Sequence, residues 1–186
     1  VADAHLVQGV RQFDAVTVPQ HLEDGLKPWR AHTPTVDVQA SAIAWTVNGE
    51  DDRSVAFAAR LMEQGVKVRI TDKATVLSGK SISRGSVFVT AMDNPKVDSL
   101  TGLIEVQARA LDVSVSAIFS GYGAGDLPDW GGSHFRLLTR PQIAILSHAR
   151  FSSYDVGASW WAIDSHLGIR HSQVDAAYVS RADLRR

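Results

Sequence analysis

The chain of 186 residues contains no cysteine. This absence excludes disulfide bonds, thiolate zinc sites, iron–sulfur ligation and cysteine nucleophiles, and it leaves the redox compartment unreadable from the sequence. An excess of one charge is lacking as well, because 19 basic and 20 acidic side chains give a net charge of -1. A near-neutral chain has no general attraction for nucleic acid or anionic membranes, so we expect no nucleic acid partner.

Long hydrophobic runs are also missing. The longest, residues 41–47 and 113–119, are far shorter than the roughly 18 residues that span a bilayer, so we expect no membrane span. Hydrophobic residues make up 45% and charged residues 21%, values typical of a globular chain of one domain or two small ones. The first residue is Val1 rather than Met, which favours a mature or excised piece.

The first forty residues carry no clear periodicity. Pro19, Gly25, Pro28 and Pro34 interrupt them, and residues 35–38 alternate like a short edge strand. We interpret residues 1–40 as a lead-in or linker segment.

A first unit is predicted over residues 41–138. Residues 41–47 form an apolar run typical of a strand buried on both faces, a helix carries Val55 and Met62 on its apolar side, and residues 66–70 alternate as a strand. Such a strand–helix–strand order favours parallel pairing. The further expected elements are, in chain order, a turn-rich insert at 78–85, a strand at 86–90, a helix from Asp98 or Ser99 to Leu111, a strand at 113–119 and a loop at 121–132.

A second unit is predicted over residues 139–186. It has a strand at 141–147, a helix capped by Ser152 or Ser153, and a strand at 169–174 after Gly168. Two strands and one helix cannot bury both faces of a sheet, so this unit either joins the first sheet or, as we favour, continues in a natural protein that extends past Arg186. The expected fold class is therefore α/β, a mostly parallel sheet with helices on both faces, in two βαβ-type units of which the second is incomplete.

Histidines offer no metal motif, since neither His-x-x-Glu nor His-Glu-x-x-His occurs. Asp164, His166 and His171 would cluster only if the end of the helix met the following strand, and exposed polar residues are the more ordinary interpretation. Ser147 precedes His148, but neighbours on an extended chain point to opposite faces, so His148 is poorly placed as its base. We predict no catalytic residue.

Ligand binding is the more open possibility. Ser147, Ser152, Ser153 and Tyr154 follow the carboxyl end of a strand, where doubly wound sheets usually bind ligands, although helix capping explains the serines equally well. Trp161, with Trp130, could stack on a sugar or a peptide; packing within the core or at an interface is the commoner role. The glycine-rich loop 121–125 lacks the last glycine and the helix of a dinucleotide site.

Five segments resemble one known family. They are residues 130–147 (WGGSHFRLLTRPQIAILS), the following SYDVG-x-x-W and D-x-x-LGI segments at 153–160 and 164–169, residues 59–68 (ARLMEQGVKV), and residues 84–89 (RGSVFV). Over residues 40–186 the chain resembles the C-terminal region of zinc carboxypeptidase-like proteins, in which a glutamine-amidotransferase-like α/β domain follows the peptidase domain.

The resemblance implies a supporting role. The family's zinc ligands lie in a peptidase domain that this chain does not contain, and amidotransferase activity needs a cysteine, which this chain lacks. We therefore expect a non-catalytic accessory region, with no cofactor in this fragment, zinc in the parent, the missing peptidase domain as partner, and a secreted or periplasmic location. The alternatives are a module that binds glycans or peptides and a hydrolase built on Ser147.

Overall fold

The computed structural model describes residues 33–148 and 151–181. The chain divides into two units by internal contacts, Val1–His32 and Thr33–Arg186, and all of the described residues belong to the second. Most of the predicted lead-in segment lies outside the described residues. Its last part joins the second unit, because Val36 forms a parallel bridge with Val115.

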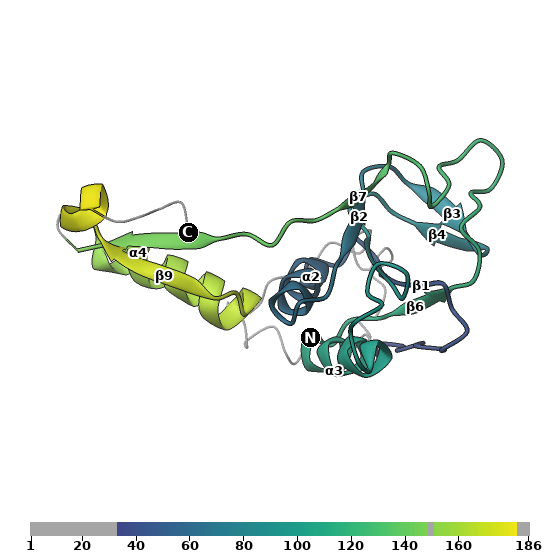
Figure 1. Ribbon diagram of the computed structural model, residues 1–186, viewed down its shortest axis with the longest axis horizontal. Helices are drawn as coiled ribbons and strands as arrows, with labels where there is room; N and C mark the ends of the chain where they lie inside the picture. The colour runs from purple at the N-terminus through teal and green to yellow at the C-terminus, as the bar shows by residue number, and fades with distance from the viewer. Residues whose placement is uncertain (1–32, 149–150, 182–186) are drawn as a thin grey trace, which may run out of the picture. The chain divides into compact units, whose positions relative to one another are not determined.

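The main sheet has five strands and is antiparallel throughout (Figure 1). Each neighbouring pair runs in opposite directions. In spatial order the strands are β6 (Ser116–Ile118), β1 (Ala44–Val47), β5 (Val87–Thr90), β2 (Arg69–Thr71) and β7 (Phe135–Leu137).

The prediction of a mostly parallel sheet with helices on both faces is wrong. β1 and β2 are joined through α2 (Arg53–Glu63) as expected, but β5 lies between them and pairs antiparallel with both. A strand–helix–strand order leaves room for a third strand to enter from later in the chain, so it does not by itself make its two strands neighbours. Among the described residues, parallel strand pairing is confined to a separate two-stranded sheet.

Among the described residues, helices cover one face of the main sheet. α2 and α3 (Leu100–Leu111) pack there in one apolar core, contributing Phe57, Leu61 and Ile104. Alternate residues of the strands point into this core, among them Trp45, Val47, Val87, Val89 and Ala117. The amphipathic spacing therefore predicted the positions of both helices in the chain correctly. It did not predict that both would pack on the same face of the sheet.

The other face is covered by a hairpin and a loop. The hairpin pairs β3 (Thr75–Leu77) with β4 (Lys80–Ile82). Trp130, from the loop between β6 and β7, packs between Phe88 and Phe135 at ring-centroid distances of 5.0 and 4.9 Å. β1 and β5 are consequently buried along their whole length. A continuous apolar run therefore indicates that both faces of a strand are buried. It does not tell whether a helix or a hairpin covers each face.

The second sheet pairs β8 (Ile143–Ser147) with β9 (His171–Asp175) in parallel. α4 (Ser153–Trp160) continues into the π-helix η2 (Trp161–Leu167), which ends at the left-handed Gly168 with φ 69°. The strand–helix–strand prediction for this unit is confirmed, and a short 3-10 helix η3 (Ala176–Arg181) follows β9.

The second sheet does not join the first one. It meets α2 through polar contacts: Arg170 Nε lies 2.8 Å from Glu63 Oε2, and Arg60 Nη2 donates to the His166 carbonyl at 3.1 Å. The strands of the two sheets share no ladder hydrogen bonds in the described part of the chain. Among the described residues, the second sheet is therefore not an addition to the first one.

Candidate functional site

The five residues predicted to bind a ligand lie where β8 ends and along the helix that follows. They are Ser147, Ser152, Ser153, Tyr154 and Trp161. Ser147 is buried, with 6% of its surface exposed, whereas the other four are exposed. The structure therefore does not bring all five onto one accessible surface.

Two of the five can act together. Tyr154 and Trp161 are seven residues apart on one continuous helix, a spacing that places them on the same side. They are 88% and 59% exposed, so both rings can contact another molecule, with one face of the Trp161 ring stacked on His166. Ser152 occupies the N-cap position of α4 but makes no capping hydrogen bond through its side chain, so the capping interpretation is not supported for it.

A groove of about 320 Å³ runs between β8 and α4, and none of those five residues lines it. Its walls are mainly apolar, with Ile143, Ile145 and Leu146 from the strand and Val156 and Ile163 from the helix. The sequence carried a signal for it, since Asp155, Ser159 and Ile163 follow one another at intervals of four and so share a helix face.

This unit leaves an unusual amount of apolar surface uncovered. α4 and η2 contain no buried residue. Leu146, Phe151, Trp160 and Trp161 are between 37% and 59% exposed. Large exposed apolar side chains mark an interaction site where they lie together.

β8 also offers its backbone for pairing. β9 occupies one edge of β8, and the second edge pairs with no described strand. A strand with a free edge presents unpaired N–H and C=O groups that another extended segment can bind. The free edge, the groove and the exposed aromatic side chains together form what we call the β8–α4 surface.

The geometry around Ser147 does not assemble a nucleophile. Its side chain is buried, and His148 follows it with φ 63°, a left-handed conformation in which the chain turns away from the strand. Within the described residues, Ser147 makes no hydrogen bond with His148.

The sequence favoured exposed polar residues over a cluster of Asp164, His166 and His171, and the structure brings two of the three near each other. Asp164 Oδ1 lies 4.0 Å from Nδ1 of His171, but His166 instead stacks on Trp161 with ring centroids 6.2 Å apart. In residues 33–148 and 151–181, no three His, Asp or Glu side chains are placed to hold one metal ion.

A second ionic cluster lies at the edge of the main sheet. Asp72 Oδ1 is 2.7 Å from His134 Nδ1, and Asp72 Oδ2 is 2.8 Å from Arg136 Nη2. The hydrogen bond from His134, with the positive charges of Arg136 and Arg84, holds the pKa of Asp72 below its ordinary value. The pair links the residue after β2 to the residue before β7.

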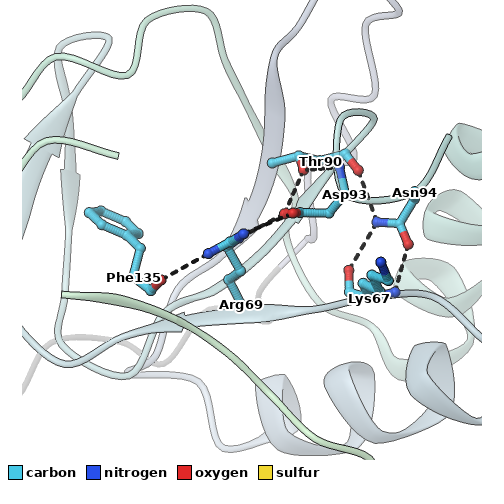
Figure 2. A network of polar contacts seen from close by, with 6 residues as sticks. All are labelled: Lys67, Arg69, Thr90, Asp93, Asn94 and Phe135. Atoms are coloured by element: carbon cyan, nitrogen blue, oxygen red, sulfur yellow. Dashed lines mark hydrogen bonds and ion pairs between the residues drawn. The ribbon is translucent and has the colours of Figure 1, made fainter. Parts of the chain in front are cut away.

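A polar network joins β2, β7 and the turn after β5 (Figure 2). Arg69 donates to both carboxylate oxygens of Asp93, at 2.7 and 2.8 Å, and to the Phe135 carbonyl at 3.1 Å. Asn94 bridges the Lys67 backbone to the Thr90 carbonyl. The network fixes the turn against the sheet.

Comparison with protein-family models, curated proteins and solved structures found no match for this chain. The family resemblance and the function derived from it therefore stand on the sequence alone. The helices over residues 33–148 and 151–181 include none with the length and apolar character needed to cross a membrane.

Proposed function

We propose that the chain is a non-catalytic accessory region of a zinc carboxypeptidase-like protein, and that its β8–α4 surface docks onto the peptidase part of the same polypeptide. The observation that carries the proposal is the complete absence of buried residues from α4 and η2, combined with a β8 strand that pairs on one side only within the described chain. A two-stranded sheet with one helix is marginal alone, because it buries too little apolar surface.

The partner that fits this surface has an extended segment and, next to it in the chain, apolar side chains. The segment would continue the sheet through backbone hydrogen bonds to the free edge of β8. The apolar side chains would fill the groove lined by Ile145 and Val156 and cover Trp160. The sequence resemblance supplies the identity of the partner, a peptidase domain that contains the zinc ligands.

The first experiment measures zinc content and carboxypeptidase activity of the 186-residue chain. We expect neither stoichiometric zinc nor turnover of peptides with a free carboxyl terminus. Any zinc carboxypeptidase assayed in the same buffer serves as the positive control for an inactive result. Zinc bound in a 1:1 ratio together with turnover would contradict the proposal.

The exposed side chains of Tyr154 and Trp161 favour a second function, binding of a glycan or a peptide. Two aromatic rings on one side of a helix offer the apolar faces on which sugars and peptide side chains stack. Titration of the tryptophan fluorescence with oligosaccharides and short peptides distinguishes the two functions. A saturable change that is lost in Trp161→Ala supports the binding module, and an unchanged signal with every probe favours the supporting role.

A further inference from the structure

The face of the main sheet beneath the hairpin changes from apolar to polar along its length. Thr46 pairs with Ser116, and Ala44 pairs with Ile118. Since residues opposite each other in an antiparallel ladder point to the same face, and residues two apart on a strand do so as well, all four side chains lie on one face. Ala44 and Ile118 belong to the apolar core there, whereas Thr46 and Ser116 do not.

A cavity of about 210 Å³ occupies the polar end of this face. Strands of the sheet contribute Thr46 and Ser116 to its lining, and Ser86, whose hydroxyl donates to the Ser83 carbonyl at 2.7 Å, adds the residue before β5. β4 of the hairpin contributes Lys80 and Ser81. The lining is rich in hydrogen-bond donors and, among the described residues, contains no acidic side chain.

Lys80 brings a positive charge to the cavity, and not all of its N–H donors are used. Its Nζ donates to the Ala117 carbonyl at 3.1 Å and lies 3.7 Å from Oδ2 of Asp37. The second distance is too long for a hydrogen bond, so Asp37 balances charge without using a donor. Because an ammonium group has three N–H donors, two remain without a short partner among the described residues.

Thr46 adds an independent observation. Its side chain is 4% exposed, and its Oγ1 is buried without a hydrogen-bond partner in the described structure. Leaving a buried hydroxyl unpaired costs about 1–3 kcal/mol, so such groups in a folded protein call for an explanation. That oxygen has almost no accessible surface, so a ligand oxygen in the cavity would become its partner only after a small movement of the lining.

We propose that this cavity binds the oxyanion group, a carboxylate or a phosphate, of a small organic molecule. The Lys80 ammonium supplies the charge, and the hydroxyl group of Ser116 donates a hydrogen bond to one of the oxygens. The site lies in the main sheet, so it is independent of the β8–α4 surface and of the proposed supporting role.

The test is a ¹⁵N–¹H NMR titration of the full chain with inorganic phosphate and, separately, with acetate, both at constant ionic strength because salt screens a surface charge. We expect saturable shifts of the Gly49 amide, which donates to Ser86 Oγ, and of the Ser116 amide. Saturation by phosphate alone assigns the site to a phosphate, and saturation by acetate alone assigns it to a carboxylate.

Lys80→Met keeps the aliphatic stem but removes the charge, and we expect it to weaken binding at least about tenfold, as expected for loss of a charged hydrogen bond. Lys73→Met is the matched control, since the exposed Lys73 side chain lies outside the cavity, and it should bind like the unchanged chain.

Ser116→Val is the second variant, for use if Lys80→Met does not fold. It retains Lys80 but removes a hydroxyl and fills space, so we expect it to lose binding as well. The proposal is overturned if neither anion produces saturable shifts, or if Lys80→Met or Ser116→Val in folded form binds as tightly as the unchanged chain.

Discussion

At the scale of single residues, the Arg69–Asp93 pair is the best-defined polar interaction of the described chain. Two short hydrogen bonds join the side chains, and Asp93 is only 17% exposed (Figure 2). The hydrogen bonds from Arg69 are the main reason that the pKa of Asp93 lies below its ordinary value of 3.8, with a further contribution from the Thr90 hydroxyl. The folded chain therefore stabilises the carboxylate form of Asp93 more than the unfolded chain does.

This pair gives a pH-dependent prediction. A carboxyl group whose pKa is lowered by folding stabilises the fold above its unfolded pKa, and the stabilisation disappears as the pH falls through the folded pKa. We expect Asp93→Asn to lower the free energy of unfolding by about 1–3 kcal/mol near neutral pH, because it leaves Arg69 with a weaker partner.

The measurement is urea unfolding of both proteins between pH 7 and strongly acidic pH. The difference between them should persist down to the ordinary pKa of 3.8 and shrink below it. Asp126→Asn, in an exposed loop, is the control and should track the unchanged chain at every pH. An Asp93→Asn effect that is the same at acidic and neutral pH would contradict the argument.

At the scale of elements, the contact between the end of β1 and the turn before β5 depends on one glycine. Gly49 lies so close to that turn that a Cβ atom would come within 2.3 Å of the Gly85 carbonyl carbon and 2.6 Å of the Arg84 carbonyl oxygen. Both neighbours are backbone atoms, which cannot rotate away. This close approach positions Ser86 Oγ to accept from the Gly49 amide at 3.0 Å.

Gly49→Ala should therefore destabilise the main sheet by about 3 kcal/mol, the upper part of the range for an added methyl group in a packed site. The measurement is the urea midpoint followed by circular dichroism. Gly131→Ala is the matched control, because a Cβ there meets nothing within 4 Å, and its effect should stay within about 0.5 kcal/mol. Equal midpoints for the two variants would show that the turn can move apart without cost.

At the scale of the whole molecule, the two sheets differ in how much they bury. The main sheet lies between two apolar cores, whereas the second sheet buries few residues, among them Ile145 and Ser147. Local stability follows burial, because opening an element exposes the surface that it buries. The two sheets should therefore open separately.

Native-state hydrogen exchange measures this difference directly. We expect the amide groups of β8 and β9 to exchange through openings of much lower free energy than those of β1 and β5. The Asp93→Asn variant serves as the internal control, because it should accelerate exchange in the main sheet and leave β8 unchanged. Equal protection of β1 and β8 would contradict the proposal that the β8–α4 surface lacks its partner.

Much of the local structure was predictable. The strand–helix–strand order around α2 and α4, the strand β5 and the left-handed end of η2 at Gly168 all agree with the sequence patterns. The hairpin β3–β4 and the strand β7 were missed, because each strand has only three residues and shows too little alternation.

The candidate sites were less predictable for a physical reason. The groove beside β8 requires knowing which helix face turns toward the strand, and the oxyanion cavity gathers residues from several separate segments of the chain. Serine and threonine are ordinary residues in isolation. Their meaning arises only when strand register places Thr46 beside Ser116 and the hairpin carries Lys80 over both.

The amino-acid sequence by itself determined where most helices and strands form, apart from the short strands β3, β4 and β7, and which side chains are apolar enough to be buried, because these properties depend on neighbours within a few residues. Tertiary structure alone decided that β5 separates β1 from β2, that a hairpin rather than a helix covers the second face, and that β8 keeps an edge unpaired within the described chain. Strand order depends on contacts between distant segments, and local periodicity carries no information about which of them meet.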